Sequence, residues 1–226
     1  MGNIDQKLNA LYENMAARGA CSIQEGGAID QFLAHPEQDS RMGVSLVFRV
    51  PDFVKTSILK KMKDIEQCAP ELYYYPPTDF HVTVLDLQRA RPGLMCSPEL
   101  AGRYTEAIRH AAKGIGPFDV RFCGIVASDS AVLVKGYYDP AFEVLRQNLR
   151  AILRQSDLPL DERYETFSCH VTIVRFPCKI KSPFAFSDVI SNLANSDFGK
   201  FTVDSIQLVY HNWYDSRKEI LSEILL

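Results

Sequence analysis

Two copies of one short motif hold the residues of this chain that are best suited to chemistry. The tetrapeptide HVTV begins at His81 and HVTI begins at His170, so His-Val-Thr followed by an aliphatic residue occurs twice. Successive side chains of a β-strand point to opposite faces, and each histidine therefore shares a face with its threonine, Thr83 or Thr172. Two such strands placed side by side would bring together two imidazoles and two hydroxyls.

This set of groups suits phosphoryl chemistry that needs no metal ion. One imidazole can take a proton from an attacking water or hydroxyl, while the other gives a proton to the leaving oxygen. The two hydroxyls can donate hydrogen bonds to the non-bridging phosphate oxygens. A single His-x-Thr on a strand is usually a satisfied structural pair, but its duplication among only five histidines favours a functional interpretation.

The elements that must position these residues repeat in the same order. A strand over 43–50 and a helix over 52–69 precede the first motif, and a strand over 131–138 and a helix over 140–156 precede the second. This repetition predicts two lobes related by a pseudo-twofold axis, in the α+β class. The other expected elements are strands over 72–75, 80–87, 118–127, 168–176, 200–210 and 218–226, and helices over 97–114 and 182–197.

The residues before the first lobe have a different character. Apolar positions three and four apart predict an amphipathic helix over 5–18, which Gly19 can end. The polar stretch 21–41 contains paired glycines and a proline. We therefore expect residues 1–42 to form an N-terminal helix and an extension that acts as a lid.

Composition and charge restrict the class of protein. The chain has 226 residues, 46% hydrophobic and 23% charged, which is enough for one domain with a real core and excludes a disordered chain or a small disulfide scaffold. The net charge of −3 argues against binding of long nucleic acid, which needs a basic field.

Cysteine usage and the lack of membrane or secretion signals predict a cytoplasmic protein. The six cysteines contain no CxxC pair, and a chain with an ample core has no need of disulfides. The N-terminus does not resemble a signal peptide, and no apolar run is long enough to cross a bilayer. We expect a monomer that does not bind membranes.

At its two motifs the chain resembles the 2H phosphoesterase superfamily, also called the ligT-like or 2′-5′ RNA ligase-like family. The signature of that family is a pair of H-x-[ST]-x motifs with hydrophobic residues at x. The resemblance extends to an opening strand and helix start at 46–54, a strand pair and helix at 118–153, and a closing hairpin at 204–226. It covers residues 43–226, and residues before 43 depart from the compact family members.

The resemblance implies a bilobal fold over 43–226. Antiparallel sheets flank a water-filled central cleft and helices lie outside, with lobes over roughly 43–125 and 126–226 and closing strands that can cross between them. It also implies that His81 and His170 form the acid/base pair and that Thr83 and Thr172 hold the phosphate. No cofactor and no metal ion is expected.

Several functions stay open at this point. The first is a metal-independent phosphodiesterase that hydrolyses a small nucleotide phosphodiester. The alternatives are a non-catalytic protein that binds a nucleotide or RNA end, and an enzyme with 2′-5′ RNA ligase activity. A metal-dependent hydrolase is disfavoured, because no Asp or Glu is expected on the motif faces. Cyclic mononucleotide ends, 2′-5′ oligonucleotides, cyclic dinucleotides and ADP-ribose cyclic phosphates all suit the four groups, and which histidine is the base is undecided.

Four further residues are candidates for substrate binding. Phe48, Tyr210 and Trp213 could stack on a nucleobase if they face the cleft. Arg175 lies five residues after His170, where family members often carry a basic residue, although a regular strand would place it on the opposite face.

Overall fold

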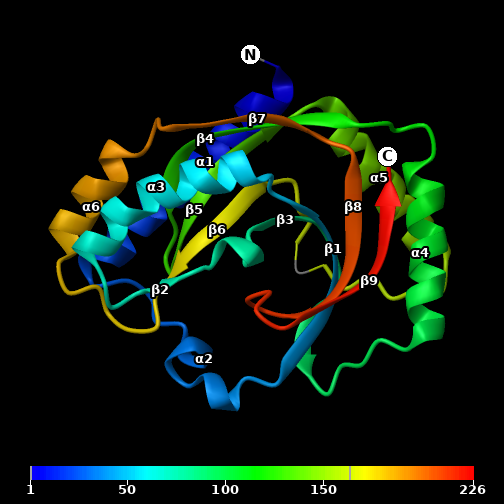
Figure 1. Ribbon diagram of the computed structural model, residues 1–226, viewed down its shortest axis with the longest axis horizontal. Coiled ribbons are helices and arrows are strands. Elements are labelled where there is room, and N and C mark those ends of the chain that lie inside the picture. Colours follow the sequence, from blue (N-terminus) through cyan, green and yellow to red (C-terminus); the bar gives the residue numbers. More distant parts are fainter. Residues whose placement is uncertain (1, 163) are drawn as a thin grey trace.

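The computed structural model describes residues 2–162 and 164–226, which form two lobes that are each built on one antiparallel sheet (Figure 1). Strand order in sheet A is β3 (His81–Pro92), β1 (Arg41–Arg49), β8 (Ser205–Asn212) and β9 (Lys218–Leu225). Strand order in sheet B is β2 (Tyr73–Tyr74), β6 (Cys169–Arg175), β5 (Ala131–Tyr138), β4 (Phe118–Ala127) and β7 (Asp197–Val203). The first motif therefore lies in sheet A and the second in sheet B.

The division between the lobes differs from the expected one. We expected a boundary near residue 125, but all of β4 pairs with β5 and β7 in sheet B. The closing strand β8 pairs with β1, which comes from the N-terminal part of the chain, and β9 pairs with β8, so both closing strands belong to sheet A. Each lobe is thus completed by strands from both halves of the sequence.

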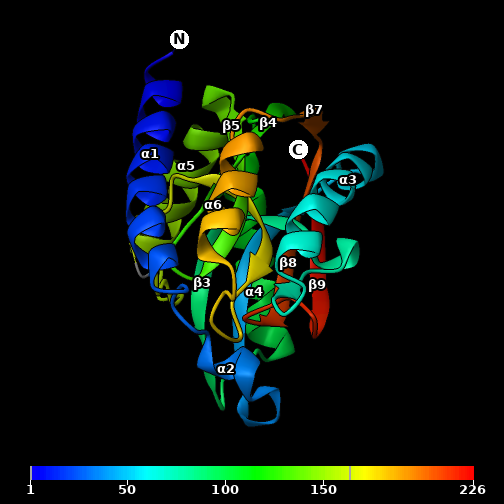
Figure 2. The ribbon, with the colours of Figure 1, turned by 90° about the vertical axis from the view of Figure 1, so that its left-hand side faces the viewer.

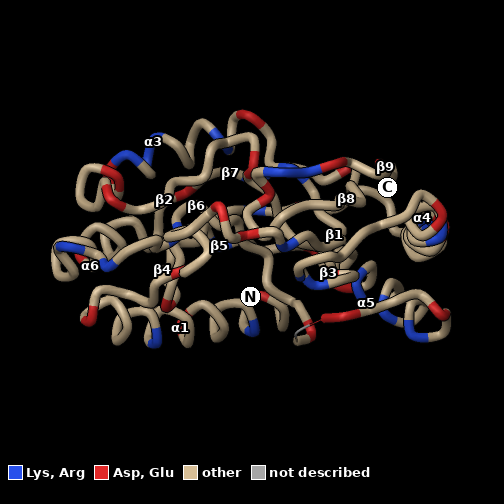
Figure 3. The backbone as a smooth tube through the Cα atoms, turned by 90° about the horizontal axis from the view of Figure 1, so that it is seen from below, with Lys and Arg blue, Asp and Glu red and all other residues tan. Residues whose placement is uncertain are grey.

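Helices surround the two sheets. The long helices are α1 (Asn3–Gln24), α3 (Asp52–Cys68), α4 (Pro98–Ala112), α5 (Pro140–Gln155) and α6 (Pro183–Asn192). The short ones are α2 (Gln31–Ala34) and the 3-10 turns η1 (Pro36–Gln38) and η2 (Pro77–Asp79). Sheet B lies between α1 on one side and α3 on the other (Figures 2 and 3).

The expected strand over 200–210 is in fact two strands. β7 ends at Val203 in sheet B and β8 begins at Ser205 in sheet A, so the chain changes sheets at Asp204. The preceding helix α6 ends at Asn192, earlier than expected, because β7 already begins at Asp197.

The N-terminal segment forms a helix that does not end at Gly19. α1 continues to Gln24, and Gly19 is buried within it. A Cβ atom at Gly19 would lie 2.2 Å from the backbone oxygen of Ala127, so this glycine permits close contact between α1 and β4. The expectation of a helix stop was wrong because the sequence does not show this contact.

Aromatic rings fill the core between the lobes. Phe48 lies edge-on to Phe142, with ring centroids 5.6 Å apart, and Phe118 stacks on Phe142 at 4.9 Å. Such pairs add roughly 0.5–1.5 kcal/mol beyond their buried area. In the part of the chain that is described, no helix combines the length and the apolarity needed to cross a membrane.

Candidate functional site

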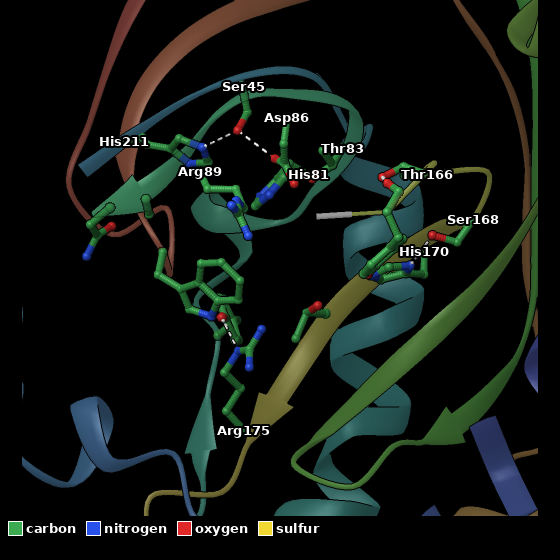
Figure 4. Close-up of a pocket in the computed structure, with 17 residues that line it drawn as sticks. Ser45, His81, Thr83, Asp86, Arg89, Thr166, Ser168, His170, Arg175 and His211 are labelled. Atoms are coloured by element: carbon green, nitrogen blue, oxygen red, sulfur yellow. Dashed lines mark hydrogen bonds between the residues drawn. The ribbon is translucent and has the colours of Figure 1, made fainter. Parts of the chain in front are cut away.

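A pocket of about 190 Å³ lies where the two motif strands face one another (Figure 4). His81 and Thr83 line it from β3, and His170 and Thr172 line it from β6. Both histidine side chains are only partly buried, so they are accessible to a ligand. The structure therefore gathers the four motif side chains in one place. The rest of the lining is Gly43, Ser45, Tyr75, Asp86, Arg89, Ala90, Tyr164, Thr166, Ser168, Arg175, His211, Asn212 and Trp213.

A β-bulge in β6 brings Arg175 into this pocket. The pairing of β6 with β5 skips one residue, Ile173, between Thr172 and Val174. An extra residue of this kind reverses the alternation of side chains beyond it. Arg175 therefore faces the pocket with His170, whereas a regular strand would place the two on opposite faces.

The same bulge occurs at the matching position of β3. The pairing of β3 with β1 skips Val84 between Thr83 and Leu85. Asp86 therefore faces the pocket with His81, where we had expected no acidic side chain. Each motif is thus followed, five residues after its histidine, by a charged side chain in the pocket, but the charge is negative in sheet A and positive in sheet B.

The ring of His81 is oriented by a backbone carbonyl and a carboxylate. Its Nδ1 lies 2.8 Å from the oxygen of Asp79, and since a carbonyl only accepts hydrogen bonds, Nδ1 carries the proton. The other nitrogen, Nε2, is left for the pocket. Oδ2 of Asp215 lies 3.8 Å from Nδ1.

Asp215 is a buried charge that is held by several donors. Its side chain is fully inaccessible to solvent and its backbone has a φ of 58°. Arg49 and Lys218 form ion pairs with the carboxylate, and Nδ1 of His211 lies 2.9 Å from Oδ1. Burial alone would raise the pKa of Asp215, but the hydrogen bond from His211 and the charges of His81 and Arg49 outweigh it and hold the pKa well below its usual range.

A chain of hydrogen bonds runs from Asp215 into the pocket. His211 Nε2 lies 3.0 Å from Ser45 Oγ, which donates to Asp86 Oδ1 at 2.9 Å (Figure 4). Burial raises the pKa of Asp86, and the Ser45 hydrogen bond opposes the rise.

Sequence reasoning did not select His211, although it is a third histidine in the pocket. Its ring centroid lies 5.9 Å from that of His81. Strand alternation places His211 on the same face of β8 as Val209, but the sequence does not show that this face meets Gly43 and Ser45 of β1 at the pocket.

The two motif histidines have different electrostatic surroundings. Burial lowers the pKa of His81 to about 4; the Asp215 carboxylate and the Asp79 backbone oxygen oppose this shift, whereas His211 and Arg49 add to it. Burial also lowers the pKa of His170 to about 4, and there the charges of His81, Arg175 and Arg146 all act in the same direction. Nδ1 of His170 lies 3.1 Å from Ser168 Oγ. Only His81 has a carboxylate that stabilises its cationic form.

Arg146, which the sequence did not suggest, connects the two motif strands. It is fully buried on α5. Its Nη2 donates to the carbonyl oxygens of Thr83 at 2.9 Å and Ser168 at 2.8 Å, and its Nε donates to that of Val84 at 2.8 Å. Its guanidinium lies 4.0 Å from the ring centroid of Phe142. One side chain thus fixes the backbone of both lobes beside the pocket.

The three aromatic residues predicted to bind substrate differ in their position relative to the pocket. Trp213 lines the pocket, and the Arg175 guanidinium lies 5.6 Å from its ring centroid. Phe48 is 1% exposed and belongs to the core, because it lies on the face of β1 opposite Ser45. The hydroxyl of Tyr210 donates to the Leu94 carbonyl at 2.7 Å, and its ring does not line the pocket. Phe48 and Tyr210 therefore do not face the pocket, which was the condition for their stacking on a base.

The side chains of the structure limit the kind of ion or ligand that the pocket can hold. Across residues 2–162 and 164–226, no three His, Cys, Asp or Glu side chains are grouped so that they could hold a metal ion. The pocket has neutral donors in Thr83 and Thr172 and cations in Arg89 and Arg175, beside the single carboxylate of Asp86. The donor set therefore suits a single anionic group.

Comparison with solved structures shows the same fold elsewhere. TT0787 of Thermus thermophilus matches with a TM-score of 0.61 at 18% identity, over 82% of this chain and 97% of that one. E. coli LigT complexed with 3′-AMP matches with a TM-score of 0.57 at 12% identity, over 82% of this chain and 98% of that one. LigT has also been solved with NADP+, and that structure matches with a TM-score of 0.50 at 14% identity, over 82% of this chain and 98% of that one.

Comparison of sequences gives the family. No curated protein sequence matches the chain significantly. The family model of the 2′-5′ RNA ligase superfamily matches residues 54–214, which is most of the chain and includes both motifs. The resemblance at the two histidine motifs is thereby confirmed, and the chain belongs to the 2′-5′ RNA ligase superfamily.

Proposed function

We propose that this protein is a metal-independent phosphodiesterase that hydrolyses a small nucleotide phosphodiester by two-histidine acid/base catalysis. The observation that carries the proposal is the meeting of His81, Thr83, His170 and Thr172 in one pocket, from two different sheets. The family and the nucleotide complexes of LigT support the same substrate class.

The surroundings of the two histidines support a division of roles. A general acid must hold a proton before reaction, and the Asp215 carboxylate favours the protonated form of His81. A general base must be neutral, and the cations near His170 disfavour its protonated form. We therefore assign His81 as the acid and His170 as the base.

Hydrolysis then needs two proton transfers around one phosphorus atom. His170 takes a proton from water while the water oxygen forms its bond to phosphorus. The bond to the leaving oxygen breaks, and that oxygen receives the proton of His81 Nε2. The hydroxyls of Thr83 and Thr172 and the guanidinium of Arg175 stabilise the charge on the non-bridging oxygens.

The test is hydrolysis of adenosine 2′,3′-cyclic phosphate and of a 2′-5′-linked diadenylate in the presence of EDTA. We expect the wild-type protein to hydrolyse at least one of them in the chelator. His81→Ala and His170→Ala should each lower kcat by about 10²–10⁴, the usual contribution of a general acid or base. His110→Ala, at an exposed position of α4, is the matched control and should leave kcat unchanged.

Three results would contradict the proposal. Activity that disappears in EDTA would indicate a metal-dependent hydrolase. Tight binding of both compounds without turnover would indicate a non-catalytic nucleotide-binding protein. Full activity in both alanine variants would show that the reaction occurs elsewhere.

A further inference from the structure

The inner face of sheet B continues beyond the second motif and beneath α1. Directly paired residues of neighbouring strands share a face, and β5 pairs Leu133 with Thr172 and Lys135 with His170. Leu133 and Lys135 therefore face the same side as the catalytic pair. In this register, the face that carries the chemistry extends from β6 onto β5.

Helix α1 covers this extension. Tyr12 lies edge-on to Tyr137, with ring centroids 5.9 Å apart, and the Tyr137 hydroxyl donates to Asn9 at 2.8 Å. The Tyr12 hydroxyl also donates to the carbonyl oxygen of Gly136 at 3.0 Å. These contacts fix α1 as a side wall of the inner face.

A groove of about 530 Å³ lies between this wall and the two central strands. Leu11 and Met15 of α1 and Leu133 of β5 supply apolar lining. Asn14 is at its rim, and Arg18 forms an ion pair with Asp129 at 2.8 Å there. A space of this volume is within the range of sites that hold small organic molecules.

The groove is continuous with the catalytic pocket. Both spaces are lined by Tyr164, His170, Thr172 and Arg175. The proposed base and a proposed phosphate-binding hydroxyl are thus at the junction of the two spaces. A phosphate held at the junction has room for one substituent in the pocket and for another in the groove.

We propose that the groove beside α1 is a second nucleoside subsite, so that the substrate is a linear dinucleotide or oligonucleotide phosphodiester with a nucleoside on each side of the scissile phosphate. This rests on the proposed phosphodiesterase function. A nucleoside 2′,3′-cyclic phosphate carries one nucleoside and leaves one of the two spaces empty.

The lining of the groove suits a nucleoside. Apolar side chains and the thioether of Met15 offer contact to the face of a base, and Tyr164 at the junction offers an aromatic ring for stacking. The side-chain amide of Asn14 offers a donor and an acceptor for a ribose. Because α1 lies before residue 54, this wall is outside the part of the chain that the family model matches.

The experiment compares two substrates in two variants that each add one large side chain to α1. Asn14→Trp places an indole at an exposed rim position of the groove, and Ala17→Trp places one at an exposed position of α1 that lines neither space. The substrates are a 2′-5′-linked diadenylate and adenosine 2′,3′-cyclic phosphate. Thermal unfolding of both variants checks that they fold like the wild-type protein.

The expected result is selective. Asn14→Trp should raise the KM for the diadenylate about tenfold or more, as the loss of roughly 1–3 kcal/mol of base contact implies, and should leave the cyclic substrate unchanged. Ala17→Trp should change neither substrate.

The possible failures are distinguishable. A wild-type protein that hydrolyses the cyclic phosphate but not the diadenylate overturns the second subsite and leaves the proposed function standing. Equal effects of Asn14→Trp on both substrates, or no effect on either, also overturn it. A wild-type protein that hydrolyses neither substrate overturns the proposed function itself.

Discussion

At the scale of single residues, the two motif histidines are chemically alike but differ in their neighbours. His81 has the Asp215 carboxylate 3.8 Å away in addition to Arg49 and His211, whereas Arg175 and Arg146, the charged side chains that act on His170, are both cations. The pKa of each is lowered to about 4. The difference in neighbouring charges, and not in the pKa values themselves, predicts how activity should depend on pH.

We predict that kcat/KM falls as the pH rises through and above the pKa of His81, because the general acid then loses its proton. The optimum should lie below the ordinary pKa of histidine, which is about 6.5 in model peptides. In Asp215→Asn this alkaline limb should move to lower pH, since the cationic form of His81 loses its stabilising carboxylate. The measurement is a pH profile of kcat/KM for both proteins.

The choice of asparagine and a surface control make this test specific. Asparagine tolerates the positive φ of residue 215, so the substitution mainly removes charge. Asp157→Asn, at an exposed residue paired with Arg103, should leave the limb in place. An unchanged limb in a folded Asp215→Asn protein would contradict the assignment of His81 as the acid.

Part of the site follows from the sequence at this scale. Strand alternation predicts that each histidine shares a face with its threonine, and the structure shows all four in the pocket. Arg175 is different, because the bulge at Ile173 reverses the alternation and nothing in the local sequence marks it. The roles of these residues in catalysis stay predictions.

At the scale of elements, the contact between α1 and β4 depends on a residue without a side chain. We predict that Gly19→Ala lowers the free energy of unfolding by roughly 1–3 kcal/mol, the usual effect of overpacking, because the added Cβ meets a backbone oxygen that cannot rotate away. Urea denaturation measures this change.

The matched control is a second glycine within a helix. A Cβ at Gly102 in α4 would have no atom within 4 Å, so Gly102→Ala should raise the free energy of unfolding by about 1 kcal/mol through helix propensity alone. If both substitutions stabilise the protein equally, the close contact between α1 and β4 does not require a glycine at position 19.

The positions of most elements were predictable, but the partners of the strands were not. Apolar periodicity locates α3, α4 and α5 to within a few residues. The prediction of one strand over 200–210 was wrong. A β-rich run of residues does not indicate that its first half pairs in one sheet and its second half in the other. A similar reason explains the lobe boundary, since pairing between distant strands is decided by packing.

At the scale of the whole molecule, the site exists only while the two lobes keep their relative position. Arg146 is fully buried and bonds to the backbone of Thr83 in β3 and of Ser168, the residue directly before β6. We predict that Arg146→Leu lowers the free energy of unfolding by roughly 2–4 kcal/mol, because buried carbonyl groups lose their donors. It should also lower kcat, since the motif strands lose a common anchor.

Chemical denaturation and steady-state kinetics of the same protein measure both effects. Arg154→Leu, at an exposed position of the same helix, is the control and should change neither quantity appreciably. An Arg146→Leu protein with wild-type stability and kcat would show that the lobes are positioned by other contacts.

Basic and acidic residues are evenly mixed over the whole molecule. The chain has 25 basic and 28 acidic residues, and both kinds are dispersed along the backbone (Figure 3). A single local cation such as Arg175 can hold one phosphate without a basic surface. The preference for short substrates over long nucleic acid stays a prediction from this distribution.

The repeated bulge has a consequence for how a substrate lies in the cleft. A phosphodiester looks nearly the same from either end, so a truly twofold pocket would accept it equally well in two opposite directions. The bulges place Asp86 and Arg175 at equivalent positions with opposite charges. We expect this difference to make the two directions of binding unequal in energy, in addition to the unequal surroundings of the two histidines.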